Sequence, residues 1–187
     1  MTKPLRPPAA TASPAAAGPE PEPAVVLSHD RALYREGMSR MAAAVNVVTT
    51  DGAAGLAGFT ATAVTSVSDD PPTLLVCMHK TAQSRPRLLA NGVFCVNTLG
   101  AGGAGLADVF AGRTGKHLDA RFEHGNWDRL VTGAPVLNDA AVSFDCRLLD
   151  VKDVATHHVL FGEVVAVRLG GQMQTLSWLH RGYRILS

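Results

Sequence analysis

Residues Ala57–Pro72 read AGFTATAVTSVSDDPP, and this segment is the most informative part of the chain. β-Branched residues dominate its middle, which predicts a single β-strand over residues 55–68. The two prolines end that strand, because proline has no N–H group to donate to a β-ladder. Within the segment no charged residue precedes Asp69, and small hydroxyl side chains recur. Such a strand can offer N–H and O–H groups to a flat polar ligand, although an ordinary threonine-rich strand has the same composition.

The sequence on both sides of this segment predicts more strands than helices. Helices are expected over residues 29–43, from Ser84 to Asn91 with Ser84 as the N-cap, and over residues 105–111. Few short helices within a run of strands predict a mainly β protein, a β-barrel with helical caps rather than a sandwich or a doubly wound sheet. The further strands are expected over residues 44–50, 73–79, 93–99, 142–148 and 157–169.

Length and composition indicate one globular domain behind an N-terminal tail. The chain has 187 residues, of which 47% are hydrophobic and 18% are charged. Residues 1–27 are rich in proline and alanine and are expected to form a disordered or extended tail, so the folded domain spans residues 28–187. The formal net charge of +1 gives no electrostatic argument for binding nucleic acid or an acidic membrane. We find no signal peptide and no membrane-spanning stretch of about 20 apolar residues.

Three cysteines, Cys77, Cys95 and Cys146, each lie in an apolar, strand-like run. An odd number with no close pair argues against a disulfide framework and for a reducing compartment, so we expect a cytoplasmic protein. All three are expected to be buried structural thiols rather than redox groups.

A glycine motif in the middle of the chain imitates a dinucleotide fingerprint. Residues 100–105, GAGGAG, fit G-x-G-x-x-G between a strand and a helix, and Asp119 follows about 20 residues later. A Rossmann unit needs a second parallel strand that ends at this acid, but the intervening sequence is polar and charged. We therefore interpret the motif as a flexible glycine loop.

The chemistry-bearing side chains form no familiar catalytic or metal-binding pattern. The seven histidines show no metalloprotease pair and no partnership with paired cysteines, so no metal site is expected. His157 and His158 are adjacent on a predicted strand and point to opposite faces. No G-x-S-x-G nucleophile elbow is present. A chemistry without a protein nucleophile is one in which a cofactor does the work.

The order of the sequence blocks supplies the missing function. The segments GFTATAVTSVSDDPPTLLVCMHKTAQSRP, FCVNTL, FAGRTGKHLDARF, VSFDCRLLDV, ATHHVLFGEVVAV and HRGYRIL follow one another over residues 30–187. This series resembles the short-chain flavin reductases that serve two-component monooxygenases, and it is most similar to those of pyrimidine utilisation and aromatic hydroxylation. The resemblance implies a split β-barrel that forms a homodimer, with flavin in a groove near the dimer interface.

The resemblance also implies which residues contact flavin. The isoalloxazine and ribityl chain would lie along the strand that starts at Phe59, and the phosphate would lie at the helix that Ser84 opens. A lysine and a helix N-terminus suit a dianion. This chain has Thr62 and Ala63 where family members often have Asn and Ser, which leaves the backbone N–H groups there as donors. The implied flavin contacts are Phe59, Thr60, Ala61, Thr62, Ala63, Ser66, Val67, Ser68, Lys80, Thr81, Ser84, Asn97 and Phe110.

His157 matches the family histidine that meets the nicotinamide substrate, and it is the one catalytic residue that the resemblance implies. Trp178, Arg181, Gly182 and Tyr183 match the C-terminal block that closes over the nicotinamide. His158 would face away, as a surface or interface residue. The remaining matching block, Lys116, Asp119 and Arg121, is interpreted as a structural ion-pair cluster that orders a loop.

The implied activity is reduction of FMN or FAD by NADH or NADPH. Hydride would pass directly between the stacked rings, with backbone N–H groups from Thr60 to Ser68 stabilising the developing charge. Reduced flavin would then leave for a partner monooxygenase, which requires moderate affinity. A non-catalytic flavin-binding or electron-carrying protein with the same barrel, or a structural dimer whose site has decayed, is the alternative. The choices between FMN and FAD and between NADH and NADPH stay open.

Overall fold

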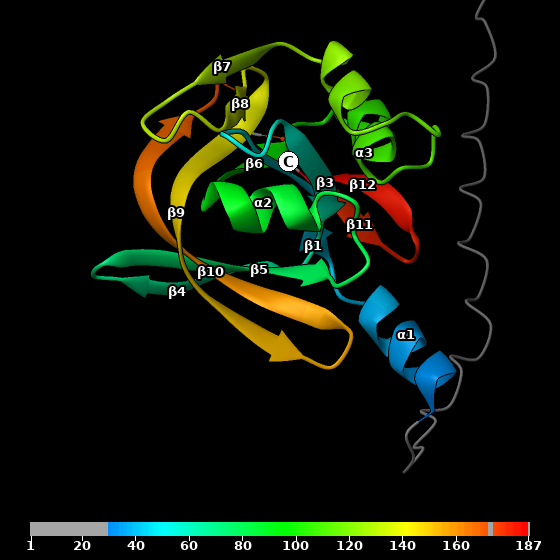
Figure 1. Cartoon of the computed structure of the whole chain (residues 1–187). Coiled ribbons are helices and arrows are strands. Elements are labelled where there is room, and N and C mark those ends of the chain that lie inside the picture. The colour runs from blue at the N-terminus through cyan, green and yellow to red at the C-terminus, as the bar shows by residue number, and fades with distance from the viewer. Residues whose placement is uncertain (1–29, 172–173, 187) are drawn as a thin grey trace, which may run out of the picture.

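Figure 1 shows the computed structural model, which describes residues 30–171 and 174–186. The predictions for the tail over residues 1–27 therefore lie outside the described residues. No helix in the described ranges is long and apolar enough to cross a membrane.

A seven-stranded sheet organises the molecule, with the strand order β3-β2-β6-β9-β10-β5-β4. Every neighbouring pair in this order is antiparallel. The structure thus confirms the prediction of a mainly β protein with short helices. The bounds are β2 Asn46–Thr50, β3 Ala57–Ala61, β4 Val64–Asp69, β5 Pro72–His79, β6 Val93–Leu99, β9 Ala140–Val154 and β10 His157–Leu169.

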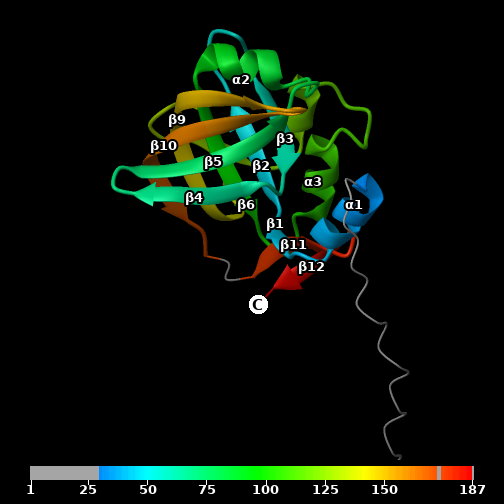
Figure 2. The ribbon, with the colours of Figure 1, turned by 90° about the horizontal axis from the view of Figure 1, so that it is seen from below.

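The sheet curls toward a barrel but its ladder is not closed (Figure 2). β3 and β4 follow one another in the chain, yet they form the two opposite edges of the sheet. The single strand expected over residues 55–68 is therefore wrong, because the chain changes partners between its halves. β3 pairs with β2, and β4 pairs with β5. At the break, the Cys77 N–H donates to the Ala63 carbonyl at 3.0 Å, which redirects the chain onto β5.

Within residues 30–171 and 174–186, three α-helices and two smaller sheets complete the fold. β1, β11 and β12 form one small sheet, and β7 and β8 form the other. The C-terminal β11–β12 hairpin was not predicted, because its turn residues His180 and Arg181 adopt φ values of 50° and 57° without the glycine or asparagine that usually signals such a turn. The bounds are α1 Arg31–Ser39, α2 Arg85–Asn91, α3 Ala104–Phe110, the 3-10 helix η1 Asp119–Glu123, β1 Ala43–Ala44, β7 Trp127–Arg129, β8 Pro135–Leu137, β11 Thr175–Leu179 and β12 Gly182–Leu186.

The core lies on both faces of β2, whose residues are all buried. Val48 faces the barrel interior, where it packs with Val76, Phe94 and Leu160 beneath α2. Val47 faces the other way and packs in the cluster that α3 covers. This second cluster requires a glycine at position 58, since a Cβ there would come within 2.7 Å of the Phe110 ring and 2.9 Å of the Val48 carbonyl oxygen. The close approach holds α3 against β3.

Candidate functional site

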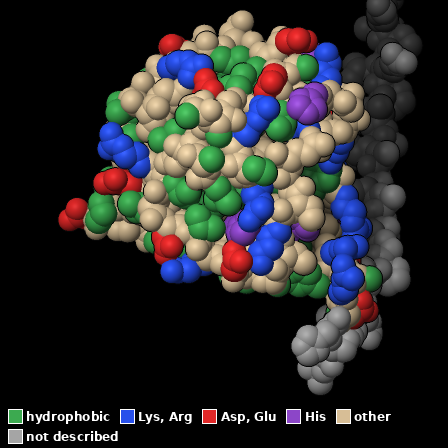
Figure 3. Space-filling view, viewed as in Figure 1, with side chains coloured by type: hydrophobic (Ala, Val, Ile, Leu, Met, Phe, Trp, Pro, Cys, Tyr) green, Lys and Arg blue, Asp and Glu red, His purple; other side chains and the backbone are tan. Residues whose placement is uncertain are grey.

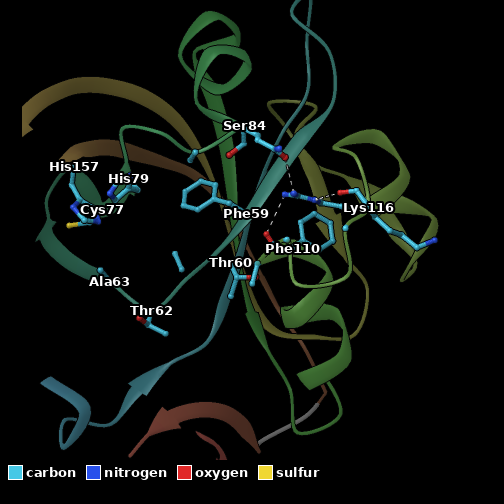
Figure 4. Close-up of a pocket in the computed structure, with 17 residues that line it drawn as sticks. Phe59, Thr60, Thr62, Ala63, Cys77, His79, Ser84, Phe110, Lys116 and His157 are labelled. Atoms are coloured by element: carbon cyan, nitrogen blue, oxygen red, sulfur yellow. Dashed lines mark hydrogen bonds between the residues drawn. The ribbon is translucent and has the colours of Figure 1, made fainter. Parts of the chain in front are cut away.

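A cavity of about 560 Å³ opens beside the break between β3 and β4 (Figure 4). Its walls come from residues 59–63, from Cys77 and His79 of β5, and from residues 82–84 before α2. The opposite wall is built from the end of α3 and the loop over residues 110–116, together with Arg121 of η1; His157 of β10 also lines the cavity. Segments far apart in the chain therefore converge on one opening.

Many of the predicted flavin contacts are brought together in this cavity. Figure 4 shows Phe59 and Thr60 of β3 in the middle of the view, Ser84 above them, and Phe110 to their right. The predicted nicotinamide residue His157 lines the same cavity. The predicted residues found here are Phe59, Thr60, Ala61, Thr62, Ala63, Ser84, Phe110 and His157.

Other predicted flavin contacts lie elsewhere. Ser66 and Ser68 line a separate groove on β4, and Val67 is exposed. Lys80 forms an ion pair with Asp153 at 3.4 Å, outside the cavity lining. Thr81 likewise is not in the lining, and its N–H and hydroxyl lie within hydrogen-bond distance of the His79 ring. The structure therefore does not bring these residues into the cavity lining.

Asn97 is a core residue rather than a cavity residue. Its side chain has 0% exposure. The carboxamide oxygen accepts from the Leu137 N–H at 2.8 Å and from the Ser143 hydroxyl at 2.9 Å. The amide nitrogen donates to the Val47 carbonyl at 3.1 Å. Asn97 thus joins β2, β6, β8 and β9, and the structure does not bring it into the cavity.

Backbone N–H groups are the available donors at the strand break. The Thr60 hydroxyl donates to the Ala107 carbonyl at 2.6 Å, so it is committed to α3. Within the described part of the chain, the N–H groups of Thr62 and Ala63 make no hydrogen bond to protein. Unpaired N–H groups at a cavity wall suit an acceptor-rich ligand.

Ser84 carries an unsatisfied hydroxyl in the wall of the same cavity. The prediction that it caps α2 through its side chain is wrong, since it makes no side-chain cap hydrogen bond. Ser84 has αR backbone angles, whereas a capping residue is usually extended. Its buried Oγ has no hydrogen-bond partner among the described residues. A buried, unpaired hydroxyl costs about 1–3 kcal/mol, and an acceptor within hydrogen-bond reach of it would recover that cost.

Arg121 places a buried cation in the cavity wall. Its guanidinium donates to the carbonyls of Lys116, Gly58 and Phe110 and to the Gln83 side chain, at 3.1–3.3 Å. Burial lowers the pKa of Arg121, because desolvation disfavours the charged form.

The predicted ion-pair cluster of Lys116, Asp119 and Arg121 is wrong. Lys116 lies 3.8 Å from Glu123, and Asp119 lies 2.5 Å from Arg87. Arg121 pairs with no carboxylate in the described ranges and orders the loop through carbonyl groups instead. The sequence spacing grouped the three residues, but their side chains reach different partners: Glu123, Arg87 and Gln83.

A pair of histidines faces the cavity from neighbouring strands. His157 and His79 are register partners on β10 and β5, and their rings meet edge to face at 4.9 Å. Sequence reasoning missed His79, Cys77 and Gln83. The alternation of β5 was the available signal, since Leu74, Val76 and Met78 are buried and the intervening residues point the other way. His158 is 4% exposed, so its predicted place at the surface is wrong.

The C-terminal hairpin adds aromatic side chains beside the cavity. Trp178 and Tyr183 line a smaller cavity of about 270 Å³, which shares Thr60, Thr62 and Ala111 with the larger one. The Arg113 guanidinium lies 5.5 Å from the Trp178 ring centre. This cation–π contact was not predicted.

The two remaining residues of the predicted C-terminal block form the hairpin turn. Arg181 points to α1, where it lies 2.8 Å from Glu36. Gly182 opens β12 directly after the turn. The structure therefore divides the block, with its aromatic residues at the cavity and its arginine at α1.

Comparisons with known proteins establish the family of the chain. A family profile described as "Flavin reductase like domain" matches residues 38–187. The chain belongs to the flavin reductase family. This membership confirms the predicted family and the predicted enzyme class, an oxidoreductase that acts on flavin.

Individual flavin reductases share both sequence and fold with the chain. "FMN reductase (NADH) RutF" of Variovorax paradoxus is 52% identical over 153 residues, which cover 82% of this chain and 84% of the relative. BorF, the flavin reductase component of a bacterial two-component tryptophan halogenase, is 31% identical with a TM-score of 0.77, over 84% of this chain and 98% of that one. The NADH:FAD oxidoreductase SgcE6 of Streptomyces globisporus is 28% identical with a TM-score of 0.79, over 88% and 98%.

Cys77 provides a reporter for ligand binding in this flavin reductase cavity. Cys95 and Cys146 are buried, as predicted, whereas Cys77 is only partly buried and lines the cavity. Burial raises the pKa of Cys146 to about 12 and also raises that of Cys95, so both thiols are unreactive. We expect iodoacetamide to label Cys77 alone in the native protein, and saturating FMN to slow that labelling severalfold. Peptide mass spectrometry would measure both; an unchanged rate with FMN would place flavin elsewhere.

Proposed function

We propose that this protein is an NADH-dependent reductase of FMN that releases reduced flavin to a partner monooxygenase. One observation carries the proposal: a single cavity joins the unpaired N–H groups of Thr62 and Ala63 to His157 on one side and to the cations Lys116 and Arg121 on the other. Figure 4 places His157 and Lys116 at opposite sides of this cavity. An elongated ligand with a polar ring system and an anionic end matches that distribution.

The residues present fit a flavin mononucleotide. The isoalloxazine would lie against residues 59–63, where the backbone donors are. The phosphate would lie toward Ser84, Lys116 and Arg121, because an unsatisfied hydroxyl and two cations favour a dianion. This arrangement moves the proposed phosphate anchor from Lys80 to Lys116, since Lys116 lines the cavity and Lys80 does not.

The chain contributes positioning and electrostatics to the reaction. Bound flavin supplies the hydride-accepting ring. The N–H groups of Thr62 and Ala63 would stabilise negative charge that develops on that ring, because they are oriented before the reaction. His157 would orient the nicotinamide carboxamide, and its Nδ1 lies 2.9 Å from the Thr156 hydroxyl, which steadies the imidazole. Trp178 and Tyr183 would border the second coenzyme from the C-terminal hairpin.

The relatives favour one pair of coenzymes and one type of partner. The RutF relatives are named for FMN and NADH, and SgcE6 is named for FAD and NADH. FMN and NADH are therefore the proposed pair, and FAD and NADPH are the competing coenzymes. BorF is a component of a two-component system, which supports a partner monooxygenase for this chain.

The deciding experiment mixes the purified protein with NADH and FMN and follows the loss of NADH absorbance. We expect steady turnover that saturates with both substrates. A yellow protein without turnover would support the alternative of a flavin carrier. Repeating the assay with FAD and NADPH would rank the coenzymes by kcat/KM.

We further propose that the protein is a homodimer that forms through the β4 edge. A largely apolar groove of about 500 Å³ lies along β4 and β10, lined among others by Val64, Leu74 and Val164. Val67, Val167 and Leu169 leave apolar side chains exposed on these strands. An exposed edge strand with an apolar face is a site that a second copy can cover.

Sedimentation velocity would test the dimer. The chain has a mass of 19.6 kDa, so we expect a species of twice that mass. Val167→Asp should shift the protein toward the monomer, whereas Leu149→Asp, at a position also half exposed but outside the groove lining, should not. A monomeric wild-type protein at micromolar concentration would contradict the proposal.

A further inference from the structure

His158 occupies the centre of a hydrogen-bonded chain that links three elements. Its side chain is buried on β10. Its Nδ1 lies 2.6 Å from the Asp153 carboxylate of β9. Its Nε2 accepts from the Arg85 Nε–H at 2.6 Å, and Arg85 is the first residue of α2. We call this group the Asp153–His158–Arg85 bridge.

The partners determine which nitrogen of His158 carries the proton. A guanidinium N–H can only donate, so Nε2 must offer its lone pair to Arg85. The proton of the neutral imidazole is then on Nδ1, from which it donates to Asp153. That hydrogen bond lowers the pKa of Asp153, and the ammonium group of Lys80 at 3.4 Å lowers it further. Both effects favour the carboxylate, which is the form that accepts a hydrogen bond from His158. The bridge therefore has a defined direction, from Arg85 through His158 to Asp153.

The bridge fastens together two segments that line different parts of the cavity. His158 follows His157, which faces the cavity from β10. Arg85 follows Ser84, whose unpaired hydroxyl lies in the cavity wall. The Lys80 N–H also donates to the Thr156 carbonyl at 3.0 Å, which ties the end of β5 to the β9–β10 turn. Figure 3 shows basic, acidic and histidine side chains gathered on the face of the molecule that carries α2.

We propose that the Asp153–His158–Arg85 bridge is a positioning device that keeps Ser84 and His157 at the separation needed to bind flavin and nicotinamide together. The inference rests on the proposed function, since it assigns both residues to coenzyme binding. His158 and Arg85 would themselves contact neither coenzyme. They act through the residues that precede them in the chain.

The bridge is surrounded by charged groups from three elements. The charged groups around the imidazole in the described structure are Arg85 from α2, Asp153 from β9 and Lys80 from the end of β5; its register partner on β5 is the neutral Met78. Loss of the two imidazole hydrogen bonds would separate Arg85 from Asp153. The first turn of α2 should then be held less firmly against β10, and coenzyme binding should weaken.

Two substitutions of His158 and one control test the bridge. His158→Gln keeps one acceptor for Arg85 and one donor for Asp153. His158→Leu keeps the bulk and removes both hydrogen bonds. Asp150→Asn is the matched control, because Asp150 lies on the same strand as Asp153 and pairs only with Lys152 among the described side chains. Each protein is titrated with FMN at neutral pH, and the KM for NADH is measured in parallel.

The expected results differ between the variants in a way that simple destabilisation would not produce. His158→Leu should raise the FMN dissociation constant about tenfold, a change equivalent to about 1.4 kcal/mol. His158→Gln should restore FMN binding to the wild-type level, because it supplies both hydrogen bonds again. Asp150→Asn should follow the wild type throughout.

Two outcomes would overturn the bridge while leaving the proposed function intact. One is an FMN affinity in His158→Gln as weak as that in His158→Leu; the other is wild-type affinity in a folded His158→Leu. Failure of the wild type to bind any flavin would instead overturn the proposed function and this inference with it. Nitrogen-15 NMR of the histidines gives an independent check in the ligand-free protein, where a proton on Nε2 of His158 near neutral pH would contradict the bridge.

Discussion

Arg121→Met is expected to lower the free energy of unfolding by about 3 kcal/mol and to weaken FMN binding at least about tenfold. The guanidinium, 6% exposed, holds the Lys116, Gly58 and Phe110 carbonyls and the Gln83 side chain. Methionine fills a similar length but leaves these buried acceptors unpaired. The loop that carries Lys116 would lose its anchor, and with it one end of the proposed phosphate site. Urea denaturation and flavin titration measure the two effects.

Arg129→Met is the matched control for this experiment. Arg129 pairs with Asp51 at 2.5 Å, but its side chain is largely exposed. Exposed ion pairs contribute about 0–1 kcal/mol, so this variant should unfold near the wild-type midpoint and bind FMN normally. Equal midpoints for the two variants would show that burial gives Arg121 no special role.

His157→Ala is expected to raise the KM for NADH about tenfold or more while changing the FMN dissociation constant less than about twofold. The reason is its assigned contact: the imidazole would orient the nicotinamide, whereas the flavin is held mainly by residues 59–63 and the cationic end of the cavity. Steady-state kinetics with varied NADH and a separate FMN titration give the two constants.

His117→Ala serves as the control, because His117 is exposed and does not line the cavity. It should leave both constants unchanged. An equal loss of NADH and FMN affinity in His157→Ala would remove the assigned nicotinamide role. It would then point to a general collapse of the β9–β10 turn, which a lowered unfolding midpoint would reveal.

Local sequence predicted the parts of the fold that depend on near neighbours. The β10 strand was expected over residues 157–169 and occupies His157–Leu169, because its branched residues favour extended backbone. The helix over residues 85–91 ends where Gly92 adopts a φ of 67°, a conformation that glycine adopts freely. The β9 strand, by contrast, runs from Ala140 to Val154, well beyond the predicted residues 142–148, because pairing with β10 extends it.

The predictions agreed best with the cavity lining for residues whose backbone position alone places them in the cavity wall. Residues 59–63 and His157 reach the cavity because the family blocks locate the end of β3, the break that follows it and the start of β10. The surface position predicted for His158 is wrong, and Lys80 lies outside the cavity lining, because both have partners from other elements. The carboxylate of Asp153 holds Lys80 and also receives the His158 hydrogen bond.

The sequence by itself determined the strand-rich composition, the flavin reductase family and the residues that line the floor of the cavity. Only the tertiary structure decided that β3 and β4 separate, that the buried Arg121 donates to carbonyl groups and to Gln83, and that His158 connects Arg85 to Asp153. The physical reason is one of range. Backbone conformation responds to residues a few positions away, whereas the partner of a buried charge is set by which distant strands and helices meet.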